Sequence, residues 1–170
     1  MGCSPEFCET KKEFIERWGK ISSNWGICKG MAQIHALLLI SPKALSSTCI
    51  MEQLDMSGGG VNMHLRELME WGLVYKCPNN TSRKEYFWAE KDIMTVFKQI
   101  VENRKKRELE PIIELLNQVE YQEVRCPDSE EFVKVVSDIK SLSVKIDHTL
   151  DSVLSTDRQW MLNTFFRLVQ

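Results

Sequence analysis

The sequence has no excess of charge of either sign, because 22 lysines and arginines oppose 24 aspartates and glutamates over 170 residues. Without a general basic field, any surface for nucleic acid must be local. Long apolar runs are also missing: the longest, Ala36 to Ile40, falls far short of the roughly 20 residues that span a membrane. The N-terminus shows no apolar core with a cleavage site of the signal-peptide kind. We therefore expect a soluble cytoplasmic protein with no membrane partner.

Motifs of enzymes and metal proteins are scarce as well. No Gly-rich phosphate loop or nucleophile motif occurs, so we expect a protein that is not an enzyme and needs no cofactor. The histidines lack ligand spacing and the cysteines form no C-x-x-C pair, which predicts no metal site and reduced thiols. An exposed thiol could sense oxidants only beside an activating charge, and scattered cysteines are usually small core residues. These residues are His35, His64 and His148, and Cys3, Cys8, Cys28, Cys49, Cys77 and Cys126.

Helical periodicity organises residues 1–40. The residues Phe14, Trp18, Ile21 and Trp25 recur at steps of four, three and four, which makes one stripe of a helix over about residues 6–27. A second, richly apolar helix follows and ends before a Ser-Pro pair, and we expect it to be buried. These two helices form the first predicted region, which supports the fold and takes part in dimerisation.

Two short helices around a tight turn are predicted next. Ser46 and Ser57 each precede such a helix and can cap it, because a serine oxygen accepts from the free amides of the first turn. The second of these helices keeps Val61 on its inward face. It stops at Trp71-Gly72, where glycine suits a left-handed helix end.

A β-hairpin and a long helical region complete the chain. The segments Leu73–Cys77 and Glu85–Ala89 are rich in β-branched and aromatic residues and flank a turn-forming loop, so they predict a two-stranded wing. Residues 92–170 read as helices, with Pro111 either kinking one or starting the next. The predicted fold is mainly α with a small β-hairpin wing: a winged helix-turn-helix domain at 41–91, flanked by dimerisation helices at 1–40 and 92–170.

This order of elements is typical of proteins that place the second short helix in the major groove of DNA. With Val61 inward, Arg66 and Asn62 face outward, where Arg can read guanine and Asn adenine. The start of this helix suits a phosphate, and the wing can reach phosphates or a minor groove. The alternative for each charged residue is a solvated surface. The candidate DNA-binding residues are Ser57, Gly59, Asn62, Met63, His64 (on the flank of the helix), Arg66, Arg83 and Lys84.

Four motifs closely resemble the GbsR-like branch of the MarR-type transcriptional regulators. They are V-N-M-H-L-R-E-L-M-E-W-G-L-V at 61–74, S-R-K-E-Y at 82–86, F-I-E-R-W-G-K-I at 14–21 and R-K-K-R-E at 104–108, within roughly residues 12–116. The resemblance implies a bacterial or archaeal homodimer that binds a near-palindromic operator as double-stranded DNA, and we expect a repressor or an activator of transcription. In some members of the branch a small effector such as choline or glycine betaine releases the DNA.

The chain departs from that branch at the start of the recognition helix. Where members have Ser-Lys-Gly-Asn-Val, this sequence has Ser57-Gly58-Gly59-Gly60-Val61. Each glycine costs a helix interior about 1 kcal/mol relative to alanine, so this turn can be loose in the absence of DNA. Side chains at Gly58 and Gly60 cannot read bases, so the operator cannot be copied from relatives.

The large aromatic stripes predicted on the terminal helices support two further expectations. Large apolar faces on terminal helices need a partner, which predicts a two-fold dimer, with packing inside one chain as the alternative. Aromatic rings can also cage a quaternary ammonium effector, although core packing explains them as well. A winged helix that binds protein instead of DNA remains the competing function. The dimerisation candidates are Phe14, Trp18, Ile21, Trp25, Trp160 and Phe165, and the effector candidates are Trp18, Trp71, Tyr86 and Trp88.

Overall fold

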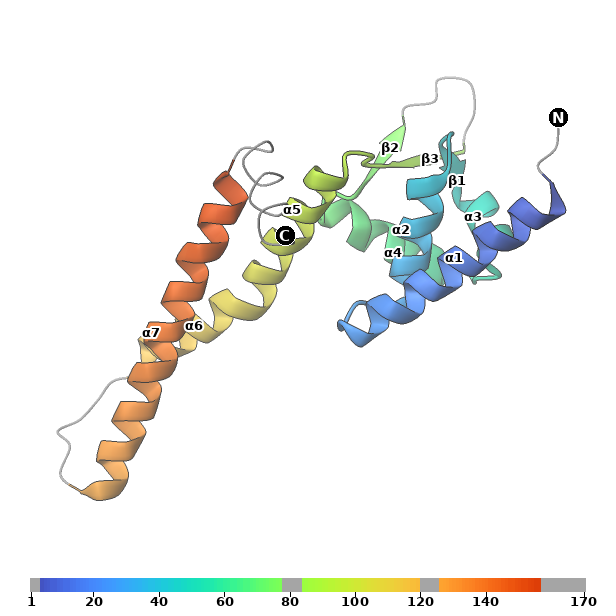
Figure 1. Cartoon of the computed structure of the whole chain (residues 1–170). Helices are drawn as coiled ribbons and strands as arrows, with labels where there is room; N and C mark the ends of the chain where they lie inside the picture. Colours follow the sequence, from blue (N-terminus) through green and yellow to red (C-terminus); the bar gives the residue numbers. More distant parts are fainter. Residues whose placement is uncertain (1–3, 78–83, 120–125, 157–170) are drawn as a thin grey trace. The chain divides into compact units, whose positions relative to one another are not determined.

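The computed structural model describes residues 4–77, 84–119 and 126–156 of the chain (Figure 1). Contacts between residues divide it into two compact units, 1–96 and 97–170, and each is described by itself. The predicted division into 1–40, 41–91 and 92–170 stays a prediction.

Two N-terminal helices open the first unit. Helix α1, Pro5–Asn24, begins where the Ser4 hydroxyl accepts from the Phe7 amide at 3.3 Å, and Pro5 suits its first turn because no amide partner is needed there. Helix α2, Lys29–Ile40, is buried along most of its length, as predicted. The two pack through Gly19 of α1, where a Cβ would stand 2.6 Å from Cγ of Gln33, so close packing depends on the missing side chain.

The helix-turn-helix follows as predicted. Helix α3, Ser47–Leu54, is capped by Ser46, and helix α4, Gly58–Glu70, is capped by Ser57. The turn between them passes through Asp55, whose φ of 51° is left-handed. Short side chains with a local hydrogen-bond acceptor tolerate that conformation better than bulky ones. Beyond α4, Gly72 has a φ of 70°, which confirms the predicted left-handed end.

The wing belongs to a three-stranded antiparallel sheet in the order β1-β3-β2. Strands β2, Val74–Cys77, and β3, Tyr86–Ala89, pair in the register Val74 to Ala89 and confirm the predicted hairpin. Strand β1, Leu45–Ser46, adds a short third strand that the sequence analysis did not predict. The residues 78–83 that join β2 to β3 lie outside the described part.

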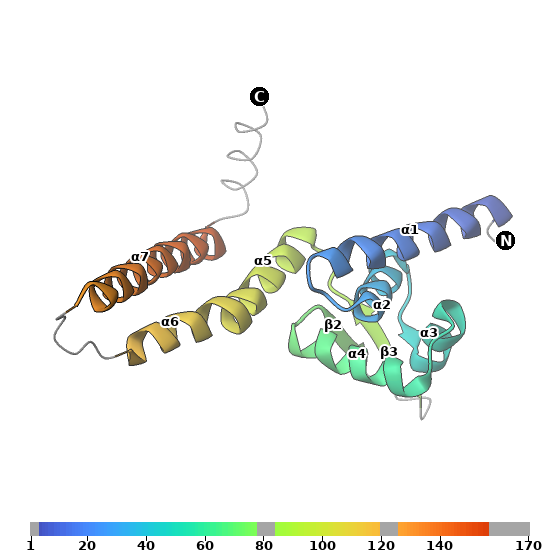
Figure 2. The same ribbon diagram turned by 90° about the horizontal axis from the view of Figure 1, so that it is seen from below.

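The core of the first unit lies where α2, α3, α4 and the sheet meet, around α2 in Figure 2. Val61 is fully buried, so the phase predicted for α4 is confirmed. The largest fully buried side chains come from four elements and are Ile34, Leu37, Leu38, Ile50, Val61, Leu65, Leu68 and Val74. This core fixes the orientation of α4 and therefore the face that α4 turns to solvent.

Lys91 closes the C-terminal end of α2. Its Nζ donates to the carbonyls of Leu38, Leu39 and Ser41 at 2.7, 2.7 and 2.8 Å, and it lies 4.2 Å from the ring centroid of Trp88. The last carbonyls of a helix have no partner within the helix, and a cation there also complements the helix dipole. Burial lowers the pKa of Lys91 below its ordinary value.

Helices make up the described part of the second unit. Helix α5, Ile93–Arg104, leads into it and continues through a π-helical turn at Lys105–Leu109 into α6, Glu110–Gln118. Pro111 lacks an amide hydrogen, and its ring would clash with the carbonyl four residues earlier, which explains a widened turn just before it. The predicted break at Pro111 therefore takes the form of a π turn within a continuous helical stretch.

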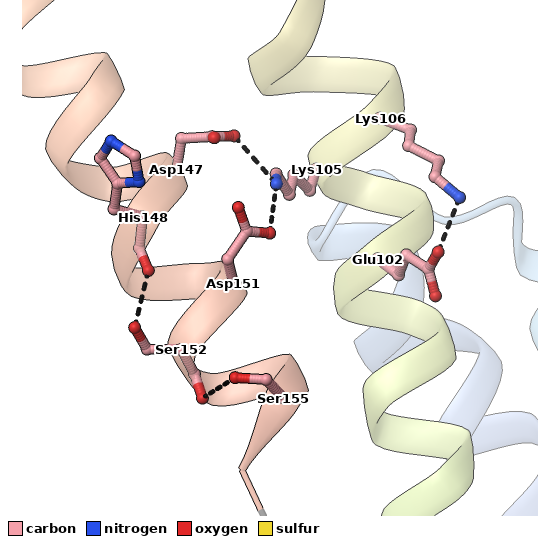
Figure 3. Close-up of polar contacts among 8 residues, drawn as sticks. All are labelled: Glu102, Lys105, Lys106, Asp147, His148, Asp151, Ser152 and Ser155. Carbon is pink, nitrogen blue, oxygen red and sulfur yellow. Dashed lines mark hydrogen bonds and ion pairs between the residues drawn. The ribbon is translucent and has the colours of Figure 1, made fainter.

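Helix α7, Pro127–Ser155, packs against this stretch. Lys105, whose side chain is only 11% exposed, pairs with Asp147 at 3.1 Å and with Asp151, both on α7 (Figure 3). These two carboxylates raise the pKa of Lys105, mainly through the hydrogen bond from Lys105 to Asp151. These ion pairs connect α7 to the π-helical turn Lys105–Leu109.

Candidate nucleic-acid interface

The solvent face of α4 carries the side chains that the sequence analysis placed there. Asn62, Met63, Arg66 and Glu70 are exposed, whereas the buried residues between them are His64, Leu65 and Leu68. Asn62 and Arg66 are four residues apart, so they lie one above the other on the same face of the helix. Met63 is 54% exposed beside them. The face therefore offers a forked cation, an amide and an apolar side chain within one turn.

The start of α4 is built for close approach. The Ser57 hydroxyl accepts from the Gly60 amide at 3.3 Å, which leaves the amides of Gly58 and Gly59 at the open end of the helix. Gly59 is exposed, and a Cβ on it would meet no atom within 4 Å. These two amides carry no side chain of their own and lie at the positive end of the helix dipole, which is the setting in which helix starts generally bind anions.

His64 does not belong to this exposed face, and the flank position predicted for it is corrected. The residue is only 8% exposed, because its ring turns toward the first turn of α2. Its Nδ1 lies 3.3 Å from Oε2 of Glu67 and its Nε2 lies 3.8 Å from Sγ of Cys28. A ring held in this way has neither the exposure nor a free edge for a base.

The wing contributes one described candidate. Lys84 is exposed at the start of the returning strand, next to an ion pair between Lys76 and Glu85 at 2.7 Å that joins the two strands. Arg83, the other predicted wing contact, lies outside the described residues. In the described part of the wing, Glu85 thus neutralises one of the two lysines, Lys76.

The four predicted effector residues come from separate elements. Trp18 lies on α1, Trp71 directly follows α4, and Tyr86 and Trp88 alternate with buried residues along β3. The ring of Trp88 already has the Nζ of Lys91 at 4.2 Å, so an internal cation occupies one of its faces. An aromatic cage that uses Trp88 would compete with that lysine.

A cavity of about 410 Å³ lies elsewhere in the first unit, between α1, α2 and α3. Most of the residues that line it are charged or polar, among them Lys11, Lys12, Glu16, Glu52 and Asp55. None of the predicted effector residues lines it. The predicted aromatic cage for a quaternary ammonium ion therefore stays a prediction, and this cavity does not correspond to it.

Exposed apolar stripes occur along α1 and along α7. Phe14, Trp18 and Ile21 on α1 and Trp25 at its C-cap are between 41% and 68% exposed, and the rings of Phe14 and Trp18 stack with centroids 5.8 Å apart. Such a stripe leaves a large apolar area in water within one chain. The other two predicted dimerisation residues, Trp160 and Phe165, lie outside the described residues.

A second stripe on α7 was missed as a dimerisation face. Its members recur at steps of three and four over two heptads and are between 42% and 60% exposed. That spacing is typical of a seam between paired helices, and it was visible in the sequence as a periodic stripe. What the sequence did not reveal is that α6 leaves this side uncovered. The stripe consists of Phe132, Val135, Ile139, Leu142 and Ile146.

Over residues 4–77, 84–119 and 126–156, no three His, Cys, Asp or Glu side chains gather in a way that could hold a metal ion. Within the same ranges, no helix combines the length and apolar character that crossing a bilayer requires.

No protein-family model and no curated protein matches this chain. Among solved structures, a protein described as a transcriptional regulator aligns with 85% of this chain and 95% of its own, at 15% identity and a TM-score of 0.62. A mutant of S. aureus MepR bound to an oligodeoxyribonucleotide aligns with 83% of this chain and 93% of its own, at 13% identity and a TM-score of 0.40, too low for an argument. The first alignment shows a shared fold and confirms the predicted winged helix.

Proposed function

We propose that this protein is a homodimeric DNA-binding transcriptional regulator that reads its operator through α4. The observation that carries the proposal is the composition of the exposed face of α4, where Asn62 and Arg66 stand one helical turn apart above a glycine-lined start. Arg and Asn are the side chains that pair bidentately with guanine and adenine in the major groove. The fold shared with a solved transcriptional regulator supports the same conclusion.

Titration of a fluorescent duplex from the region upstream of its own coding sequence tests the proposal. Wild-type protein is compared with Arg66→Ala at two salt concentrations. We expect the substitution to weaken binding by about 1–3 kcal/mol, as loss of one bidentate base contact does, and we expect affinity to fall steeply with salt. Arg17→Ala is the matched control, because Arg17 is exposed on α1 and its loss changes the net charge equally.

Binding that depends little on salt would favour the competing function, a winged helix that binds protein. The exposed Met63 and the acidic Glu70 on α4 are the features that favour it, because a DNA-reading face is usually more basic. Equal affinities of wild type and Arg66→Ala for DNA would count against reading through α4.

The dimer is proposed from the two exposed stripes on α1 and α7. A two-fold pair would place two copies of α4 roughly 34 Å apart, one turn of DNA, which matches a palindromic site. Analytical ultracentrifugation should report a dimer for wild type. Leu142→Glu puts a charge into the α7 stripe and should yield monomer, whereas Ser141→Glu adds the same charge beside it on the exposed side. A wild-type monomer at micromolar concentration would contradict the dimer.

A small effector and membership of the GbsR-like branch of MarR-type regulators are proposed from the sequence motifs alone. A ligand can shift the spacing of the recognition helices only by its different affinity for the two spacings. Choline and glycine betaine should therefore each be added to the DNA titration, and release of DNA by either would support the assignment. Unchanged DNA affinity at millimolar concentrations of both would remove them as effectors. We also propose that the protein regulates transcription as a repressor and has no enzymatic activity.

A further inference from the structure

Three side chains form a chain of contacts between α2 and α4. Cys28 directly precedes α2 and is an exposed residue, and its Sγ lies 3.8 Å from Nε2 of His64 in a partly buried contact. The other ring nitrogen of His64, Nδ1, lies 3.3 Å from Oε2 of Glu67. If the ring proton is on Nδ1, that nitrogen donates to the carboxylate and Nε2 accepts the proton of the thiol. This arrangement of nucleophile, base and orienting carboxylate is the one that activates nucleophiles in proteins.

Gly30 holds the imidazole in this place. A Cβ on Gly30 would stand 2.7 Å from Nε2 and 3.1 Å from Cδ2 of His64, so the ring fits against the first turn of α2 only because glycine is there. The imidazole is therefore buried on one side by backbone, while Cys28 beside it is an exposed residue. A reagent can therefore approach Cys28 from the solvent side while the imidazole stays in place.

We propose that Cys28 is a covalent-modification site for carbon electrophiles of the α,β-unsaturated carbonyl class, with His64 as its base and Glu67 as the residue that positions the ring. His64 Nε2 takes the thiol proton, and the sulfur electron pair forms a bond to the β-carbon. The carbon–carbon π pair moves to the enolate, and the imidazolium returns the proton to the α-carbon. Nothing leaves and no oxidant is consumed, so the adduct contains all atoms of both reactants.

Modification would reach α4 directly, because both partners in this chain of contacts, His64 and Glu67, belong to that helix. An adduct on Sγ ends the contact with Nε2 and crowds the ring that lies against Gly30, so α4 must shift or rotate. This consequence rests on the proposed function, in which α4 reads DNA. Electrophiles of this class would then act as a signal that releases the operator.

Competition labelling with N-ethylmaleimide, itself an α,β-unsaturated carbonyl compound, tests the site. The folded full chain is labelled briefly and the adduct at each cysteine is counted by peptide mass spectrometry. Cys8 is the reference, because it is also exposed; Cys126 is unsuitable, since the Ser129 hydroxyl lowers the pKa of its thiol. We expect Cys28 to react at least about tenfold faster than Cys8, a threshold below the roughly 100- to 10,000-fold that a positioned base typically contributes. Equal rates overturn the proposal.

Variants of His64 and Glu67 distinguish the loss of the base, or of the residue that positions it, from a general loss of stability. His64→Gln should bring the rate at Cys28 to within about twofold of Cys8, because no base remains beside the sulfur. Glu67→Gln, whose amide oxygen can still accept from Nδ1, should keep most of the fast rate, whereas Glu67→Leu should lose it. Glu67 is only partly buried, so both variants are expected to fold, and equal rates for them would overturn its positioning role.

A DNA titration after labelling separates this inference from the proposed function. Labelled wild type should lose affinity at least about tenfold, as a shifted recognition helix requires, while labelled Cys28→Ser should bind as before. If untreated protein binds no DNA but Cys28 still labels fastest, the regulator proposal fails and the nucleophilic site stands. If Cys28 labels fastest and DNA binding is unchanged, the link to α4 is overturned.

Discussion

His35 should make the stability of the first unit depend on pH in a way that one substitution removes. The residue lies on α2, is 5% exposed, and its Nε2 has no hydrogen-bond partner among the described residues. Burial lowers the pKa of His35 from 6.5 to about 4, and the nearby positive charge of Lys91 acts in the same direction. The folded protein therefore holds this imidazole neutral at a pH where the unfolded chain protonates it.

The sign and size of this pH dependence follow from the difference in proton binding between the folded and unfolded states. Between pH 6.5 and about 4 the unfolded state binds more protons than the folded state at this residue, so stability falls as pH falls. A pKa difference of about 2.5 corresponds to about 3 kcal/mol, all of it present above pH 6.5 and lost once the pH has fallen to about 4. That is a large fraction of the roughly 5–15 kcal/mol that typically stabilises a domain.

Urea unfolding followed by tryptophan fluorescence measures this loss, because Trp18, Trp25, Trp71 and Trp88 all belong to the first unit. The free energy of unfolding is determined at pH 7.5 and pH 4 for wild type and for His35→Met, which keeps an apolar side chain of similar size. We expect wild type to lose about 3 kcal/mol more than the variant over this interval. His148→Met, at an exposed position of α7, is the control that should behave as wild type. Equal losses in wild type and His35→Met would refute the reasoning.

Three further substitutions have outcomes that follow from the immediate surroundings of the replaced residue. Lys91→Met should lower the free energy of unfolding by about 3 kcal/mol in urea titrations, because three helix-end carbonyls lose their donor, while exposed Lys43→Met should change it by less than about 0.5 kcal/mol. Gly59→Ala should raise stability by about 0.5–1 kcal/mol in the same assay, since the added methyl meets no atom within 4 Å. Lys105→Met should cost roughly 1 kcal/mol, seen as a lower melting temperature by circular dichroism, because two aspartates of α7 lose their cation.

Elements that depend on neighbours in the sequence were predicted well. Ser46 and Ser57 were identified as caps because a helix start satisfies its free amides with a side chain three residues earlier, which is a local requirement. The phase of α4 followed from one buried residue, Val61, and the helical repeat. The end of α4 followed from Gly72, where a positive φ admits glycine without strain.

Features that depend on distant segments were not predicted. Strand β1 is two residues long, and Leu45 is recognisable as a strand residue only once it is seen to pair with Phe87. Lys91 reads as one more surface lysine, yet it caps a helix about fifty residues earlier in the chain. The open stripe on α7 was visible as a repeat, but whether another helix of the same chain covers it is a matter of packing. Such contacts leave no periodic signal in a single sequence.

The same distinction between local and distant determinants applies to the candidate site. The outward direction of Asn62 and Arg66 is a property of helical geometry, and it could be read from the sequence. The inward direction of His64 is not, because a residue at the flank can turn to either side. Its position was decided by Gly30 on another helix, where the absence of a side chain makes room for an imidazole ring.

Adjacent positions of α4 therefore serve different partners. Arg66 points to solvent, where DNA is proposed to lie, and Glu67, about 100° further around the helix, holds the imidazole that contacts Cys28. Because a short helix moves as one body, a displacement at His64 and Glu67 must also move Arg66. A base contact worth about 1–3 kcal/mol requires hydrogen-bond geometry within a few tenths of an ångström, so even a small rotation of α4 would suffice to lose it. Chemistry at the thiol could thus control DNA binding without any adduct touching the DNA-facing side of the helix.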